Sequence, residues 1–264
     1  MTPPALRLDP RDQLRSQFRS SGIVVLDDVF PAAMSSELQA QGIELDRLRA
    51  ARSDPELFSP WMALFNLGCE GGRVRGADQR VPARLWKAIR HNFDQDVNGE
   101  HGLYLFYSYL LSCRAEPPDT CASDSVACRG RPSAGCALCR VVTQLASEAL
   151  RACLRDITGL ALSGSALSLC FTRFDADSVL SPHDDVSTDP CRELTFLYYA
   201  NTPWPEDWGG ELCFQRGDGP VQRIAPRGNR LVLFEPTREA RHWVPPVAAT
   251  APRSRFAVAG WYLK

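Results

Sequence analysis

Residues 166–263 decide the fold, because short apolar runs alternate there with clusters of Asp, Pro and Gly. The runs are ALSLCFTRF (166–174), ELTFLYYA (193–200), GELCF (210–214), VQRIA (221–225), RLVLFEP (230–236), RHWVPPV (241–247) and RFAVAGWYL (255–263). Many short strands at such spacing are typical of a β-sandwich or barrel, with the jelly roll among them. The last third of the chain is therefore predicted to form a β core.

Before about residue 160 the patterns are mostly helical. An amphipathic stretch closes at Gly22, and GIVVLDDVF (22–30) is predicted to be a strand. Helices are predicted at residues 31–52, 82–96 and 140–157, with Gly159 ending the last. Packed on one sheet, they give an α+β fold that is mainly β. We expect a single domain over residues 1–264, with a helix-rich part at 1–160 and the β core at 161–264.

Charge and hydropathy exclude several classes of partner. Thirty basic residues balance thirty-one acidic ones, so no long-range field attracts nucleic acid or an anionic membrane. The N-terminal residues lack the apolar segment of a signal peptide, and apolar runs such as residues 103–111 are too short to cross a bilayer. We expect a soluble cytoplasmic protein with a small-molecule substrate. Its oligomeric state stays open between monomer and homodimer.

The chain has four histidines, and two of them fit a metal site. His91 lies in a predicted helix as a surface residue, and His101 lies in a polar turn. His183 and Asp185 are two residues apart, a spacing that places both side chains on one face of a strand. With His242 from a neighbouring strand they make the two-histidine, one-carboxylate set that suits non-haem Fe(II). Alternatively, His183 to Asp185 is a polar turn and His242 a core histidine.

A family resemblance favours the metal site. Residues 167–263 resemble the double-stranded β-helix core (jelly roll, cupin-like) of 2-oxoglutarate- and Fe(II)-dependent oxygenases, in particular the prolyl-4-hydroxylase-like branch. The segments that match in order and approximate spacing are FTRFDADSVLSPHDD, FLYYAN, WGGELCF, APRGNRLVLFEP, RHWVPPV and RFAVAGWYL.

The resemblance implies roles for four residues. His183, Asp185 and His242 match the iron ligands. Arg255, six residues before Trp261, matches the arginine that pairs with the distal carboxylate of 2-oxoglutarate, and a guanidinium fits a carboxylate as a fork of two donors. Arg253 is the nearby competitor.

Other positions are weaker candidates. Tyr199 matches a tyrosine that reaches the same distal carboxylate in oxygen-sensing relatives, although a buried strand aromatic is an alternative. Phe174 stands where many relatives have a tyrosine. The carboxylate of Asp185 disfavours halogenation, since related halogenases have a small residue there. Further candidates for contacts to the substrate or to the ligands are Asp184, Arg173, Trp243 and Trp208.

Five of the ten cysteines lie in a segment rich in Pro and Ser: Cys113, Cys121, Cys128, Cys136 and Cys139. Four of these thiols can complete a tetrahedral zinc site, and Cys136 and Cys139 have the spacing of half of one. The other spacings match no zinc module. We therefore interpret the insertion 113–139 as a loop and a candidate substrate lid, with structural zinc and redox-sensitive thiols as alternatives.

The resemblance implies an enzyme that uses Fe(II), 2-oxoglutarate and O2, with ascorbate as an auxiliary reductant, to hydroxylate an unactivated C–H bond. A free amino acid or natural-product intermediate is the first choice of substrate, because no peptide-docking module is evident. A peptidyl hydroxylase, acting for example on proline, is the alternative. A non-catalytic metal-binding interaction protein on the same fold is a hypothesis of another class, against which the triad and Arg255 argue.

Overall fold

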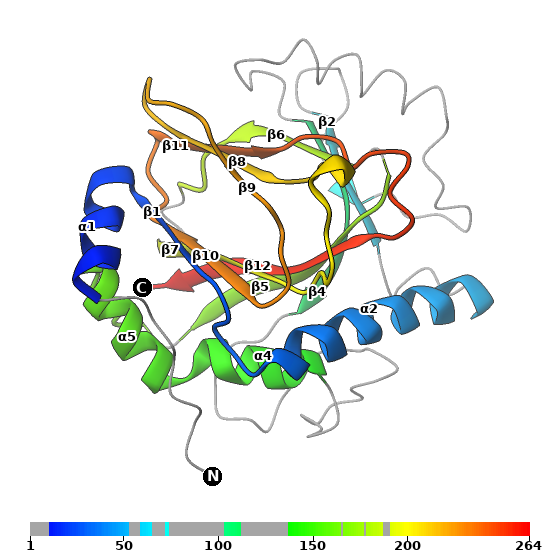
Figure 1. The fold of residues 1–264 in the computed structure, drawn as a ribbon, viewed down its shortest axis with the longest axis horizontal. Helices are drawn as coiled ribbons and strands as arrows, with labels where there is room; N and C mark the ends of the chain where they lie inside the picture. The colour runs from blue at the N-terminus through cyan, green and yellow to red at the C-terminus, as the bar shows by residue number, and fades with distance from the viewer. Residues whose placement is uncertain are drawn as a thin grey trace.

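Among the described residues, one antiparallel sheet of twelve strands forms the centre of the molecule (Figure 1). The computed structural model describes residues 11–52, 59–64, 72–73, 103–111, 137–164, 166–176, 178–186 and 191–264. The strands are β1 (Ile23–Leu26), β2 (Ser59–Leu64), β3 (Gly72–Arg73), β4 (Leu103–Leu111), β5 (Leu167–Phe174), β6 (Val179–His183), β7 (Arg192–Tyr199), β8 (Leu212–Arg216), β9 (Gln222–Ile224), β10 (Arg230–Phe234), β11 (Ala240–Val244) and β12 (Arg255–Leu263). Their main order is β1-β10-β7-β12-β5-β4-β6-β11-β8-β9, and β2 pairs with β3 and β4.

The sheet is folded into two layers (Figure 1). The lower layer contains β1, β10, β7, β12 and β5, and the upper layer contains β6, β11, β8 and β9. Strand β4 connects them, because its residues 107–111 pair with β5 and its residues 104–105 pair with β6. The predicted mainly β core of the double-stranded β-helix type is confirmed.

Alternate side chains along the strands of the lower layer belong to two separate apolar clusters, one on each face. Leu231 and Leu233 of β10 face the helices, whereas Val232 and Phe234 face the space between the layers. Side chains alternate between the faces of a strand, so a continuous apolar run such as RLVLF is what a strand covered on both faces requires. The space between the layers is where a ligand site can form.

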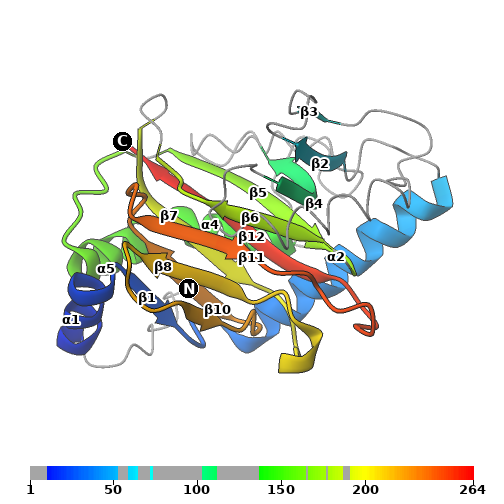
Figure 2. The ribbon, with the colours of Figure 1, turned by 90° about the horizontal axis from the view of Figure 1, so that it is seen from above.

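Helices cover the outer face of the lower layer. The helical elements are α1 (Arg11–Ser21), α2 (Ala32–Arg52), α4 (Ala137–Ala146), α5 (Glu148–Thr158) and the 3-10 turn η1 (Glu206–Trp208). Figure 1 shows α2, α4 and α5 beneath β5 and β12, and the view from above in Figure 2 shows the long helix α2 behind the sheet. The buried side chains of α4 and α5, such as Val141 and Leu154, pack into the cluster on this face.

The first part of the chain departs from its prediction in two ways. The helix predicted at 140–157 is two helices, because Ser147 has an extended backbone and caps α5 by accepting a hydrogen bond from the amide of Leu150. The apolar run 103–111 is the connecting strand β4, so the helix-rich part also contributes strands to the sheet. The helix predicted at 82–96 lies outside the described residues.

Several boundaries agree with the sequence. Helix α1 ends before Gly22 and α5 before Gly159, and both glycines have a positive φ that favours glycine after a helix. Among the described residues, no helix is both long and apolar enough to cross a membrane.

Candidate active site

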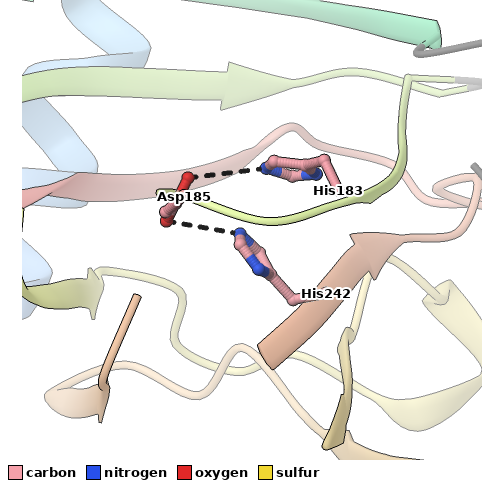
Figure 3. Close-up of side chains that lie close together, drawn as sticks. All are labelled: His183, Asp185 and His242. Carbon is pink, nitrogen blue, oxygen red and sulfur yellow. Dashed lines mark ion pairs between the residues drawn. The ribbon is translucent and has the colours of Figure 1, made fainter. Parts of the chain in front are cut away.

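Two histidines and one aspartate meet between the layers (Figure 3). His183 is the last residue of β6, and His242 on β11 is its direct partner in the antiparallel register. Nε2 of His183 lies 3.8 Å from Oδ1 of Asp185, and Nε2 of His242 lies 3.5 Å from Oδ2. The three ligand atoms lie within 4.8 Å of one another. Cross-strand pairing therefore places the two imidazoles together.

The backbone position of Asp185 differs from the position predicted from the sequence. Strand β6 ends at His183, so Asp185 lies two residues beyond it rather than at an i+2 position within the strand. Asp185 is 5% exposed, and its Oδ2 accepts a hydrogen bond of 3.0 Å from the hydroxyl of Thr195 on β7. The ligand is thus oriented by a strand of the opposite layer.

Hydrogen bonds give both imidazoles the tautomer that a metal requires. Nδ1 of His183 lies 2.8 Å from the carbonyl oxygen of Ser181, and Nδ1 of His242 lies 3.3 Å from that of Ala240. Because a carbonyl oxygen can only accept, each Nδ1 carries the proton and each Nε2 presents its lone pair to the cluster. Two neutral imidazoles and a carboxylate with open positions fit Fe(II).

The electrostatics keep these side chains ready to bind a cation. Burial, followed by the neighbouring His242, lowers the pKa of His183 to about 4. Burial would raise the pKa of Asp185, but the neighbouring His242 and His183 outweigh it and hold that pKa below its usual value. At neutral pH, His183 is therefore neutral and Asp185 is a carboxylate.

A cavity of about 460 Å³ extends from this cluster to Arg255. Its charged and histidine lining residues are His183, Asp184, Asp185, Arg192, His242 and Arg255. Apolar side chains, among them Leu180, Leu197 and Val244, make up much of the remaining wall. The size is within the usual range for a small-molecule site.

Arg255 is a buried cation whose charge is not balanced within the described part of the protein. It is 1% exposed, and Nη2 donates a hydrogen bond of 3.2 Å to the hydroxyl of Tyr199. Its Nε has no hydrogen-bond partner among the described residues, and no carboxylate of these residues forms an ion pair with it. A buried charge without a partner is costly, so this corner of the cavity fits an anionic ligand.

Phe174, which stands where many relatives have a tyrosine, packs its ring against the guanidinium of Arg255. The Phe174 ring centroid lies 4.6 Å from the guanidinium carbon of Arg255, and that of Tyr199 lies 4.9 Å from it. Phe174 cannot donate a hydrogen bond, whereas the Tyr199 hydroxyl lies at the guanidinium. The competitor Arg253 does not line the cavity, because it binds the carbonyl oxygens of Thr202 and Pro203.

One of the remaining candidate residues lines the cavity and the other three do not. Asp184 is exposed at the cavity, where its Oδ1 accepts a hydrogen bond from the amide of Val186. Arg173 is buried in an ion pair of 2.7 Å with Asp175 and does not line the cavity. Trp208 packs edge to face against Trp204 and also lies outside the cavity wall, as does Trp243.

The cysteine segment is described at one position. Cys139 is buried in α4 within the core. Cys113, Cys121, Cys128 and Cys136 lie outside the described residues, so the zinc and lid hypotheses stay predictions. Within the part of the chain that the structure describes, His183, Asp185 and His242 form the one group that could hold a metal.

Sequence reasoning missed three residues of the site: Arg192, Thr195 and Trp261 as a wall residue. Thr195 and Trp261 are cross-strand partners on β7 and β12, far apart in the sequence. Their period-2 positions within apolar strands were the available signal, but that signal does not show which face borders a cavity.

Comparison with known proteins agrees with the geometry. Residues 169–263 match the family model of the 2OG-Fe(II) oxygenase superfamily. A prolyl-4-hydroxylase from Pseudomonas putida has a similar fold, with a TM-score of 0.56 and 16% identity over 97% of this chain and 100% of the other. A Trichoplax adhaerens prolyl hydroxylase, solved with a peptide fragment of hypoxia inducible factor, has a TM-score of 0.58 and 16% identity over 96% and 88%.

A third solved structure, an oxidoreductase of the 2OG-Fe(II) oxygenase family from Burkholderia pseudomallei, has a TM-score of 0.55 and 15% identity over 98% and 92%. The comparison with curated proteins found no significant match. Residues 169–263 therefore match the 2OG-Fe(II) oxygenase superfamily, and the chain has a fold similar to that of prolyl-4-hydroxylases. The match indicates a dioxygenase that uses Fe(II), 2-oxoglutarate and O2.

Proposed function

We propose that the enzyme hydroxylates an unactivated C–H bond of a small molecule, with a free amino acid as the first candidate. The observation that carries this choice is the cavity of about 460 Å³, which has two charged side chains, Arg192 and Asp184, beyond those assigned to metal and cosubstrate. Charges of both signs suit a small zwitterion, because polar groups in a pocket fix the orientation of the ligand.

We assign the iron to His183, Asp185 and His242. Their support is the convergence of two Nε2 lone pairs and a buried carboxylate within 4.8 Å. Bound Fe(II) and 2-oxoglutarate supply the oxidising chemistry, in which O2 and 2-oxoglutarate yield succinate, CO2 and the hydroxylated substrate.

The protein's own side chains bind, orient and exclude water. Arg255 holds the distal carboxylate of 2-oxoglutarate through its guanidinium, and Tyr199 supports it. Thr195 fixes the orientation of the Asp185 carboxylate. The apolar wall of Leu180, Leu197 and Val244 keeps water from the reacting atoms.

We further propose that residues 1–264 act as one oxygenase domain. Strands β1 and β4 come from the first 160 residues, yet β1 pairs with β10 and β4 pairs with both β5 and β6. Removal of the first part would leave β10, β5 and β6 each with one unpaired edge.

The test is succinate release by the purified protein with Fe(II), ascorbate and 2-oxoglutarate. One arm adds free amino acids and the other adds a peptide library. We expect release to rise above the substrate-free rate for an amino acid, and His183→Ala to abolish it. Turnover of peptides and of no free amino acid would reverse the ranking in favour of a peptidyl hydroxylase. Two of the structural neighbours are named prolyl hydroxylases, and one of them was solved with a peptide fragment.

A further inference from the structure

Arg192 is a second arginine at the cavity, and a local irregularity of β7 directs it there. Along the β7–β12 pair, Trp261 faces Thr195 and Tyr262 faces Leu194, but Leu263 faces Arg192. The strand β7 therefore has one extra residue, Glu193, at this point. A bulge of this kind redirects side chains and is common beside active sites.

The bulge changes the face on which Arg192 lies. Leu194, Phe196 and Tyr198 belong to the cluster under the helices, whereas Thr195 and Leu197 line the cavity. In a regular strand Arg192 would share the face of Leu194. Instead it lines the cavity with Thr195.

Aromatic stacking holds the guanidinium in place. The guanidinium carbon lies 3.7 Å from the ring centroid of Trp261, which also lines the cavity. This contact orders a long side chain before any ligand arrives, so less conformational entropy is lost on binding.

The guanidinium has donor capacity that the described residues do not use. Nη1 donates a hydrogen bond of 3.1 Å to the carbonyl oxygen of Asp185 and lies 3.8 Å from Oδ1 of the same residue. Nε is buried and has no hydrogen-bond partner among the described residues. The Asp185 carboxylate already faces two histidines and Thr195, so it neutralises Arg192 incompletely.

We infer that Arg192, stacked on Trp261, binds a carboxylate of the substrate. This inference rests on the proposed hydroxylase function and specifies its substrate class. Arg255 is assigned to the cosubstrate, and Arg192 is the other arginine in the cavity wall. A single guanidinium edge fits a carboxylate as a two-donor fork.

The position of Arg192 also constrains the reaction. Its Nη1 lies 3.8 Å from a carboxylate oxygen of the metal-binding Asp185. A substrate anchored there by its carboxylate has its nearest carbons beside the metal-binding side chains. The oxidised C–H bond is therefore a few bonds from the carboxylate, and the anchored group is a free carboxylate rather than a backbone amide.

The experiment measures binding, not only turnover. Free amino acids and simple monocarboxylates are titrated calorimetrically, each beside its primary carboxamide, into the anaerobic Fe(II) and 2-oxoglutarate complex of the full chain. We expect at least one carboxylate to bind about 10- to 100-fold more tightly than its carboxamide, the range for hydrogen bonds between charged groups. Equal binding of every pair by the unmodified protein overturns the inference without any variant.

Variants then separate substrate binding from positioning of Asp185. Arg192→Gln is expected to remove the preference for the carboxylate and to raise its KM more than it lowers kcat, whereas Arg192→Lys keeps part of the preference. Arg238→Gln, at an exposed arginine that does not line the cavity, is the matched control. If Arg192→Gln weakens acid and amide equally, Arg192 only positions Asp185 and the inference is wrong. If the unmodified protein forms no complex with Fe(II) and 2-oxoglutarate, the proposed function fails and the inference with it.

Discussion

His242 on β11 lies directly opposite His183 on β6, with ring centroids 4.1 Å apart and both Nε2 atoms near Asp185. Like-charged imidazolium rings at this separation would repel, which disfavours a doubly protonated pair, and both rings are expected to be ligands of one cation. His183→Ala should abolish the weak visible charge-transfer band of the anaerobic Fe(II) and 2-oxoglutarate complex. His91→Ala, at a predicted surface position, should retain the band. Retention of the band in His183→Ala would show that the metal is held elsewhere.

Thr195 orients the carboxylate of Asp185, a proposed metal ligand, through its 3.0 Å hydrogen bond to Oδ2. Thr195→Val should lower the affinity for Fe(II) by about 10- to 100-fold, as removal of such outer partners does in other metal sites. Competitive metal titration measures the affinity for Fe(II). Thr195→Ser keeps the hydroxyl and should restore most of the affinity, which a simple packing defect would not permit.

Arg255 and Tyr199 are expected to determine the affinity for 2-oxoglutarate. Arg255→Gln should raise the Kd of 2-oxoglutarate by about 100-fold or more, because each hydrogen bond to a charged group contributes about 1.5–3 kcal/mol. Tyr199→Phe should raise it by about 10-fold. Titration of 2-oxoglutarate into the anaerobic Fe(II) complex of each variant gives both Kd values.

Tyr198→Phe is the matched control for Tyr199→Phe. Tyr198 lies next in the chain, but it faces the helices and its hydroxyl donates to Oδ1 of Asn229. Its removal should cost about 1 kcal/mol of stability and leave the Kd of 2-oxoglutarate unchanged. An equal loss of affinity in the two variants would contradict the assignment of Tyr199.

The metal-free protein should lose stability as the pH falls from about 6.5 to about 4. Burial lowers the pKa of His183 from 6.5 to about 4, so in this range the unfolded chain binds a proton that the folded chain does not. The free energy of unfolding therefore rises with pH over this window and is constant for this group outside it. The expected change is about 3 kcal/mol, at about 1.4 kcal/mol per pKa unit.

Urea unfolding at several pH values measures this slope. His183→Gln removes the group and should flatten the slope between pH 6.5 and 4. The pKa of Asp185 lies below its usual value of 3.8, so most of its own contribution is lost below the window of His183. An unchanged slope in His183→Gln would place the proton uptake on another residue.

Ser147 separates α4 from α5 and caps the second helix. Ser147→Ala should lower the free energy of unfolding by about 1 kcal/mol, the usual cost of losing a side-chain cap. Ser147→Thr keeps the hydroxyl and should retain most of the stability. Urea unfolding with metal present in both samples provides the comparison, and equal losses in the two variants would contradict the assignment of the effect to the hydroxyl cap.

The sequence by itself determined the β core, the helices at both ends of the first part and the residues that form the triad. Apolar runs such as RLVLF and the turns between them specify strands through local periodicity. His183, Asp185 and His242 could be selected because few histidines occur and their context resembles a family.

Only the tertiary structure decided what surrounds those residues. The run 103–111 is a strand because it pairs with β5 and β6, and such pairing between distant segments leaves no local signal. Arg192 reaches the cavity because a bulge against β12 turns it to that face, and Thr195 reaches Asp185 across the two layers. Register and layer packing depend on contacts between residues far apart in the chain, and for that reason periodicity alone could not predict them.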